Sequence, residues 1–322
     1  MMAMNSGAFR CAVLFLLAIS STLIAAATIN STKIVQKNAP WHLARISHRK
    51  LTPNNKSEFV YNSNRDGRGV TVYVLDSGVD TKHVEFEGRA RIGANLIEGD
   101  DQPDNLGHGT ECASLVAGKT VGVAKKAQVV SVKITYRGNP RAFQAGLEFV
   151  LKDAKKNPQF KSVASISVGT EKVSQGLEDA LTKLIEAGVT VVAAAGNGAN
   201  DPCVLWPARR KDVITVAGSD INDNWGETSG GKCVDILAPS VDILSAEYNP
   251  REPDVHDKLG ITGGSSDATP IVAGVVAGFL SEQPMSPAEV MALLRKTATK
   301  NAIRGIPPGT PNLLVYNDKT SQ

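Results

Sequence analysis

The sequence predicts an α/β fold, with a mainly parallel sheet covered by helices on both faces in a single domain. Short, almost uninterrupted apolar runs rich in valine recur from about residue 70 onward, and such runs are typical of strands buried on both faces. Amphipathic helical patterns lie between them, and this alternation favours parallel strands with crossover connections. No repeat, low-complexity tract or linker divides residues 46–322, so we expect one domain there.

Five strands are expected from the apolar runs, at Val70–Leu75, Val129–Ile134, Val163–Val168, Val189–Ala195 and Val213–Ala217. Two helices are indicated by residues that share one helical face. These residues are Phe143, Leu147, Val150 and Ala154 in the first helix, and Leu177, Leu181, Leu184 and Ile185 in the second.

A third helix is indicated by the stretch S-P-A-E at residues 286–289. Ser286 is a suitable N-cap, Pro287 is tolerated at the first helical position, and Glu289 can reach back to form a capping box.

The first 27 residues have the pattern of a secretory signal peptide. Arg10 precedes the apolar stretch Cys11–Ile19, and alanines follow at positions 25–27, as at a signal-peptidase site. A membrane anchor is the alternative, because the apolar stretch is nearly long enough to cross a bilayer. The single flanking basic residue and the alanines favour cleavage, so we expect a secreted, extracellular protein without a membrane anchor.

Residues 28–45 are expected to form an N-terminal segment ahead of the main domain. Asn30 and Asn55 each begin a possible glycosylation site. Cleavage of the signal removes Cys11 and leaves Cys112, Cys203 and Cys233 in an oxidising compartment.

Composition restricts the possible partners of the chain. Of its 322 residues 42% are hydrophobic and 21% are charged, and the net charge is only +3. These values are ordinary for a soluble globular protein. A charge this small, without a basic run, argues against a nucleic-acid or membrane-surface partner. We expect a monomer.

Two turns contain candidate catalytic residues. Asp76 follows a buried strand in V-L-D-S-G, where a carboxylate needs a partner or a function. His108 lies between glycines in L-G-H-G-T and begins an apolar helical pattern. Taken singly, each residue is more often structural than catalytic.

A third turn reads G-G-S-S-D-A-T-P, residues 263–270. Proline is tolerated in the first turn of a helix, so Pro270 predicts a buried helix that begins at Ser266 or Asp267. A serine there faces the positive end of the helix dipole, which favours an oxyanion. By itself this turn would favour an ordinary serine N-cap over a nucleophile.

The three turns together follow the chain order Asp, His, Ser that one class of serine hydrolase uses for its catalytic triad. In such a triad the serine attacks a carbonyl, the histidine takes its proton, and the aspartate orients the histidine. The α/β-hydrolase arrangement would need G-x-S-x-G and the order Ser, Asp, His, and neither is found.

From about Asn38 to the C-terminus the chain resembles the proteinase K-like branch of the subtilisin family (subtilases). The resemblance is carried by N-A-P-W-H-L-A-R-I-S, D-S-G-V-D-T-K-H-V-E-F-E-G-R-A, G-H-G-T-E-C, G-V-A-K-K-A-Q, A-A-A-G-N, G-x-S-x-A-T-P and P-N-L-L-V-Y-N. It implies a subtilisin-like peptidase domain over residues 46–322 that hydrolyses polypeptides and uses no cofactor in catalysis.

The resemblance also implies residue roles. It makes Ser266 the nucleophile of a triad with Asp76 and His108, and gives Asn197 the oxyanion contact beside the Ser266 amide. Ser167, Val168 and Gly169 match one side of the substrate cleft, where a peptide adds as an extended strand.

Two structural features follow from the same resemblance. Cys203 and Cys233 match a disulfide of some relatives, which leaves Cys112 as a buried free thiol. Asp235 matches a calcium ligand, and the backbone carbonyls near Lys211 and Val213 would join it, because calcium takes oxygen ligands.

Several departures from the family pattern keep two functions open. Glu111 and Ile271 replace histidines and Asp267 replaces a methionine, the stretch with Pro140 between Ile134 and Phe143 is short, and few residues precede Asn38 for a propeptide. The first interpretation is a secreted serine endopeptidase, and the second is a pseudoprotease that binds peptides or a protein partner. We expect Asp267 to slow acylation by repelling the oxyanion, most strongly at alkaline pH.

Overall fold

A computed structural model describes residues 31–51, 57–134, 139–156, 161–198 and 201–320. The expected signal peptide and the candidate glycosylation sites at Asn30 and Asn55 lie outside these residues. The compact unit runs from Ser31 to Gln322, earlier than the expected boundary at residue 46. That boundary is the last residue of α1 (Trp41–Ile46), in which Leu43 is fully buried.

The central sheet has the strand order β12-β13-β9-β8-β7-β6-β3-β5-β4 in the described residues. All neighbouring strands in it are parallel except the pair β12–β13. The strands are β3 (Thr71–Asp76), β4 (Ala90–Asn95), β5 (Gln128–Lys133), β6 (Ser162–Ile166), β7 (Thr190–Ala194), β8 (Ile214–Ser219), β9 (Ile236–Pro239), β12 (Thr299–Lys300) and β13 (Leu313–Leu314). The five predicted strands are confirmed as β3, β5, β6, β7 and β8, with ends shifted by one or two residues.

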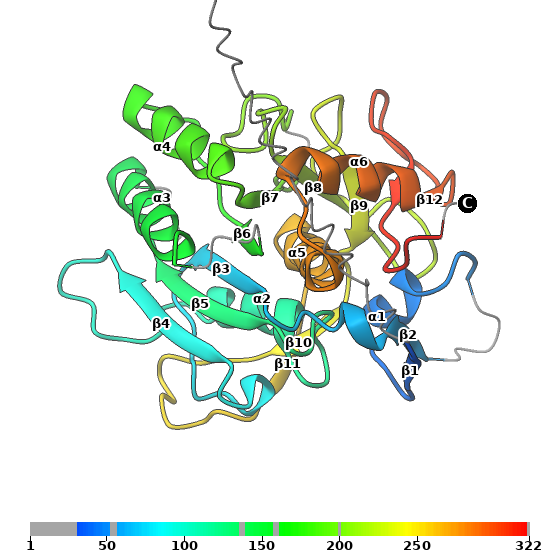
Figure 1. The fold of residues 1–322 in the computed structure, drawn as a ribbon, viewed down its shortest axis with the longest axis horizontal. Coiled ribbons are helices and arrows are strands. Elements are labelled where there is room, and N and C mark those ends of the chain that lie inside the picture. Colours follow the sequence, from blue (N-terminus) through cyan, green and yellow to red (C-terminus); the bar gives the residue numbers. More distant parts are fainter. Residues whose placement is uncertain (1–30, 52–56, 135–138, 157–160, 199–200, 321–322) are drawn as a thin grey trace, which may run out of the picture. The chain divides into compact units, whose positions relative to one another are not determined.

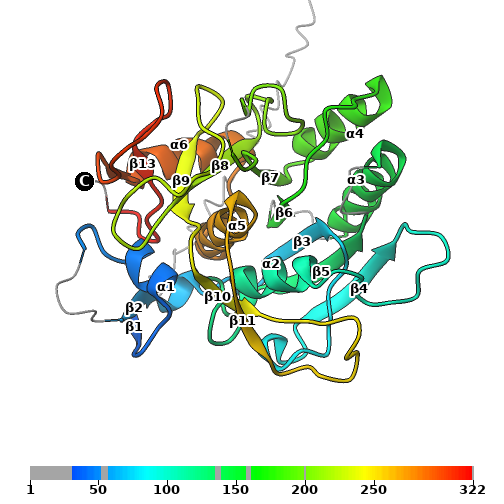
Figure 2. The same ribbon diagram turned by 180° about the vertical axis from the view of Figure 1, so that it is seen from behind.

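Helices cover both faces of this sheet. On one face lie α3 (Pro140–Ala154) and α4 (Gln175–Glu186), and on the other lie α2 (His108–Ala117), α5 (Ser265–Glu282) and α6 (Pro287–Thr297). Figures 1 and 2 show α3 and α4 on one side of the sheet and α2 and α5 on the other. Alternate residues of β3 point to the two faces: Val72 and Val74 join the core under α2 and α5, whereas Tyr73 and Leu75 join the core under α3 and α4.

The predicted helical faces are also confirmed. Leu177, Leu181 and Leu184 of α4 are fully buried. Ser286 caps α6, and its capping box with Glu289 is present. Helix α5 is buried along almost its whole length, as expected for a helix that is apolar nearly all round. None of the helices in the described ranges is both long and apolar enough to cross a membrane.

Short elements outside the sheet were not expected from the sequence. Two antiparallel strand pairs join β1 (Lys33–Gln36) with β2 (Phe59–Asn62) and β10 (Ile243–Ala246) with β11 (Leu259–Thr262). Short 3-10 turns occupy Ser63–Arg65 and Val84–Phe86. The predicted Cys203–Cys233 disulfide is confirmed, with a Cα–Cα distance of 5.3 Å.

The strand order determines where a site can form. The chain passes from β3 to β4 and β5 on one side of β3, and then returns to place β6 and β7 on its other side. In open α/β sheets, ligands bind beyond the carboxyl ends of the strands at such a change of direction. Asp76 is the last residue of β3, Ser167 follows β6 directly, and Asn197 lies shortly after β7.

Candidate active site

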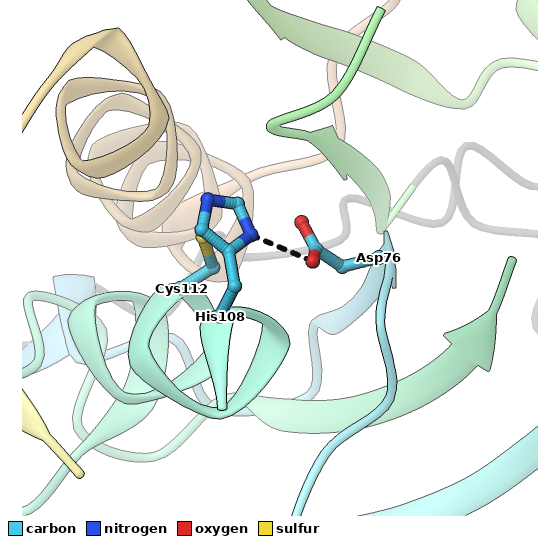
Figure 3. Close-up of side chains that lie close together, drawn as sticks. All are labelled: Asp76, His108 and Cys112. Atoms are coloured by element: carbon cyan, nitrogen blue, oxygen red, sulfur yellow. Dashed lines mark hydrogen bonds and ion pairs between the residues drawn. The ribbon is translucent and has the colours of Figure 1, made fainter. Parts of the chain in front are cut away.

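Asp76 and His108 are hydrogen-bonded at the carboxyl end of β3. Asp76 is fully buried, and His108 is the first residue of α2. His108 Nδ1 lies 2.7 Å from Asp76 Oδ1, and the Ser77 amide donates to the same oxygen at 2.7 Å. Figure 3 shows this contact, with the second ring nitrogen of His108 on the side away from Asp76. The carboxylate thus holds the proton on Nδ1 and leaves Nε2 as the basic nitrogen.

A buried carboxylate that the sequence analysis missed, Asp104, joins the Asp76 turn to the start of α2. Its oxygens accept five hydrogen bonds, from Ser77 Oγ, the amides of Leu106 and Gly107, and the amide and hydroxyl of Thr110. Ser77 Oγ also accepts from the Gly109 amide at 3.0 Å. The only signal in the sequence was an aspartate just ahead of a helix, which ordinary caps share.

The glycines on both sides of His108 allow α2 to approach its neighbours closely. A Cβ at Gly109 would lie 1.9 Å from the carbonyl oxygen of Gly78, in the turn that follows Asp76. A Cβ at Gly107 would lie 2.3 Å from the carbonyl oxygen of Tyr248, and the φ of Gly107 is +87°. A larger residue at either position would move His108 away from Asp76.

Ser266 lies in the first turn of α5, next to the end of β6. Its hydroxyl donates to the Ser167 carbonyl at 3.1 Å, and the Ser167 hydroxyl donates back to the Ser266 carbonyl at 2.8 Å. Cys112, one turn after His108 on α2, contacts the same Ser266 carbonyl through its sulfur at 3.4 Å. The expected nucleophile is therefore tied both to the helix that carries His108 and to β6.

Pro270 explains why the Ser266 carbonyl is open to these contacts. Helix α5 begins at Ser265, so Pro270 lies in its second turn, and the prediction that it lies in the first turn was wrong. Proline has no N–H to donate to the carbonyl four residues earlier, which is that of Ser266. Ser167 and Cys112 donate to this carbonyl instead, and this offsets the loss of the helical hydrogen bond.

Asn197 is held against the start of α5 by Ser265. Its Oδ1 accepts from the Ser265 amide at 2.8 Å and from the Ser265 hydroxyl at 3.1 Å. These bonds direct the carbonyl of the side-chain amide toward the helix, so its NH₂ group is left to donate elsewhere. Gly264 makes room, because a Cβ there would lie 3.0 Å from Asn197 Nδ2 and its φ is +118°.

The expected substrate-binding segment begins beside Ser266. Ser167 contacts the Ser266 backbone and hydroxyl, as described above. The side chain of Val168 is buried in the core under α3 and α4. Gly169 lies against Leu205, because a Cβ added at Gly169 would lie 2.8 Å from the Leu205 side chain. The opposite edge of the expected cleft includes residues 135–138, which are outside the described ranges.

Two further carboxyl groups, those of Glu111 and Asp267, act on His108 electrostatically. Burial raises the pKa of Glu111 to about 7 and that of Asp267 to about 6. Asp267 is 2% exposed, and its Oδ1 accepts from Thr262 Oγ1 at 3.0 Å. Burial alone would lower the pKa of His108, but the charge and hydrogen bond of Asp76, with Glu111 and Asp267, raise it to about 9.

Cys112 is the buried free thiol that was expected. Burial raises its pKa well above the usual value, with further effects of the charges on Asp76 and Asp267. Its sulfur, a nitrogen of His108 and an oxygen of Asp76 lie within 4.8 Å of one another. A metal ion would need the thiolate form, which this environment disfavours.

The surroundings of Asp235 differ from those expected for calcium. Asp235 Oδ2 accepts from the Thr215 amide at 2.8 Å, and Oδ1 accepts from Arg295. Asp235 lines a cavity together with Lys211, and the Val213 side chain is buried. Calcium prefers several oxygen ligands of which some carry negative charge. A single carboxylate that already bonds a guanidinium fits calcium poorly.

Comparison with known proteins identifies the family. Residues 67–312 match the model of the subtilase family of peptidases. The chain belongs to the subtilase family. A crystal structure of a cold adapted subtilisin-like serine proteinase aligns with a TM-score of 0.78 and 34% sequence identity, over 87% of this chain and 99% of that one. The subtilisin-like fold expected from the sequence is thereby confirmed, while the proteinase K-like branch stays a prediction.

Several curated relatives of this subtilase are fungal proteins. The chain is 40% identical over 309 residues to a subtilisin-like protease of Coccidioides posadasii, and 39% identical over 292 residues to a subtilase-type proteinase of Schizosaccharomyces pombe. Each alignment covers 88% of this chain but only 61% and 63% of those proteins. A subtilisin-like serine protease of Rhodotorula mucilaginosa, 38% identical, is covered over 87% of its length.

Proposed function

We propose that this subtilase is a secreted serine endopeptidase that hydrolyses polypeptides through an acyl-enzyme. The observation that carries the proposal is the 2.7 Å contact between Asp76 and His108, on a helix tied through Cys112 to the backbone of Ser266. In this proposal Ser266 is the nucleophile, His108 the general base and Asp76 the group that orients it.

The proposed reaction starts with a rotation of the Ser266 hydroxyl. In the structure this hydroxyl donates to the Ser167 carbonyl at 3.1 Å, and rotation about the Cα–Cβ bond frees it to donate to His108 Nε2. Its oxygen then attacks the substrate carbonyl carbon while Nε2 takes the proton. The imidazolium next gives this proton to the leaving amine, and water releases the acyl group by the same sequence of steps.

Two donors are proposed to stabilise the oxyanion that forms. The Ser266 amide lies in the first turn of α5, where backbone N–H groups have no acceptor within the helix. The second donor is Asn197 Nδ2, because Ser265 engages the other end of the same side-chain amide. Such prearranged donors act where negative charge develops and need no reorganisation during the reaction.

The alternative function, a pseudoprotease that binds peptides, is favoured by one specific observation. The charges of Asp76, Glu111 and Asp267 raise the pKa of His108 to about 9, which favours the protonated form at neutral pH, and a protonated histidine cannot act as a base. We therefore propose a protease that is attenuated near neutral pH and becomes active as His108 loses its proton.

Hydrolysis of a fluorogenic peptide or casein by the purified chain between pH 6 and pH 10 tests this proposal. We expect activity that rises toward pH 9 and is lost in Ser266→Ala, whereas the neighbouring Ser265→Ala keeps part of it. Equal rates in the parent and Ser266→Ala across this range, with peptide binding retained, would support the pseudoprotease instead.

Secretion and a monomeric state are parts of the same proposal. The Cys203–Cys233 disulfide supports secretion, because disulfides persist in oxidising compartments. The proposed chemistry uses only side chains and backbone groups of the chain. The calcium expected at Asp235 is not included, because the residues around this carboxylate fit it poorly.

A further inference from the structure

Asp235 directly precedes β9, and both of its carboxylate oxygens accept hydrogen bonds. Its backbone amide donates to the Thr215 carbonyl at 2.9 Å, and the Thr215 amide donates back to Asp235 Oδ2 at 2.8 Å. The hydroxyl of Thr215 in turn donates to the Ala208 carbonyl at 2.7 Å. One carboxylate oxygen is therefore committed to the backbone of β8.

The other oxygen, Oδ1, accepts from Arg295 in the last turn of α6. Val290 and Leu294 anchor this helix in the core, and Arg295 reaches from its last turn to the residue that precedes β9. The Asp235 side chain is only 13% exposed, whereas that of Arg295 is 51% exposed. The guanidinium thus covers a carboxylate that would otherwise be a largely buried, uncompensated charge.

The surrounding cavity, of about 520 Å³, is basic. Besides Asp235, it is lined by five basic side chains: Arg209, Arg210, Lys211, Lys232 and Arg295. Besides Arg295, two of them are paired with acids, since Arg209 and Arg210 lie 2.6 and 2.9 Å from oxygens of Glu178. A divalent cation bound to Asp235 would be repelled by the remaining basic groups and would have to displace Arg295.

We propose that Arg295 supplies the cation at Asp235 in this subtilase, so that the chain is held together there by an internal ion pair and binds no calcium at this position. The carboxylate becomes a metal site only when Arg295 is removed. Its oxygen is then free, and one of the repelling cations is lost with the arginine.

The test compares melting temperatures of the full chain in excess calcium and in a chelator, all in a Ser266→Ala background that prevents self-digestion. Because the melting temperature of this variant can be measured whether or not the parent is a protease, the result does not depend on the proposed activity. Asp235→Asn measures the calcium response that arises elsewhere in the chain. Lys296→Ala, which removes the next basic residue of the same helical turn, is the matched control.

We expect the parent and Asp235→Asn to show the same calcium response. Arg295→Ala should melt roughly 3–6 °C lower than the parent in chelator. The reason is that the substitution removes a partly exposed guanidinium and leaves the largely buried carboxylate of Asp235 without its counter-charge. Calcium should restore part of this loss in Arg295→Ala but not in Arg295→Ala/Asp235→Asn, and Lys296→Ala should melt like the parent.

Two results would overturn the proposal. A calcium response in the parent that exceeds the response of Asp235→Asn would show that calcium binds Asp235 despite Arg295. An Arg295→Ala variant that melts like the parent in chelator would show that the arginine does not compensate the carboxylate.

Discussion

Replacing Asp267 by asparagine should raise activity most strongly near neutral pH, through its effect on His108. Asparagine keeps the shape of the side chain and an oxygen that can accept from Thr262 Oγ1, which now donates at 3.0 Å. It removes the charge that Asp267, with a pKa of about 6, carries at pH 7 and above. That charge is one of three that raise the pKa of His108 to about 9.

The size of the effect is limited by the rank of Asp267 among these charges. Its charge raises the pKa of His108 less than the charges of Asp76 and Glu111 do. We therefore expect the pKa of His108 to fall by at most about one unit in Asp267→Asn, which would raise its neutral fraction at pH 7 by up to about tenfold. The expected gain in kcat/KM at pH 7 is of the same size, and it should vanish near pH 10.

The sign of this pH dependence separates two mechanisms. Because Asp267 stabilises the charged imidazolium, it raises the pKa of His108. The fraction of His108 that is neutral and can act as a base is therefore reduced at pH values below that pKa. Repulsion of the oxyanion, which we expected from the sequence, would act wherever Asp267 is ionised and would be clearest at alkaline pH. The burial of Asp267 beside Thr262 and the raised pKa of His108 favour the first mechanism.

The assay is the pH profile of kcat/KM on a fluorogenic peptide, together with the His108 titration followed by NMR in a Ser266→Ala background. Thr262→Val is the matched control, because it removes the hydrogen bond but keeps the charge, and should behave like the parent above pH 8. A His108 pKa that does not move in Asp267→Asn, or a gain in kcat/KM that increases toward pH 10, would refute the reasoning.

Three further predictions concern residues around the site. Asn197→Leu should lower kcat by roughly 100- to 1000-fold with little change in KM, since it removes one oxyanion donor; steady-state kinetics with an equal effect on KM would contradict this. Removing the Cys203–Cys233 disulfide, whose cysteines are 30 residues apart, should cost roughly 3–4 kcal/mol of unfolding free energy in the chain-entropy model; denaturant titration of Cys203→Ala/Cys233→Ala measures it, and a change under 1 kcal/mol would count against it. Asp104→Leu should unfold more easily and lose most activity, because five donors, four of them in buried hydrogen bonds, lose their acceptor; unchanged kcat/KM in a folded variant would show that Asp104 does not position His108.

The strands and helices that hold the site were predictable because buried segments have a characteristic apolar pattern in the sequence. Runs such as Val70–Leu75 are apolar on both faces since helices cover both sides of the sheet. The strand pair β10–β11 was not predictable in this way, because β11 is largely exposed and lacks such a run. The start of α5 was misjudged because the tolerance for Pro270 in the second turn depends on Ser167 and Cys112, which are remote in sequence.

The same distinction applies to the site. Asp76, His108 and Ser266 lie in turns whose glycines and order have a recognisable pattern. Arg295, in contrast, reaches Asp235 across 60 residues, and only the packing of α6 determines which of its side chains lies above β9. The raised pKa of His108 likewise depends on charges from three separate elements that together outweigh the opposite effect of burial, and a sequence does not display this balance.

The most direct test of the central claim is the site of covalent labelling by a fluorophosphonate probe. The probe reacts with a serine that is activated by a neighbouring base and an oxyanion hole. Mass spectrometry of the labelled chain at pH 9 should place the adduct on Ser266, and labelling should be lost in Ser266→Ala and His108→Ala. An adduct on Ser265, or no adduct on a folded chain at any pH between 6 and 10, would contradict the assignment of Asp76, His108 and Ser266 as a catalytic triad.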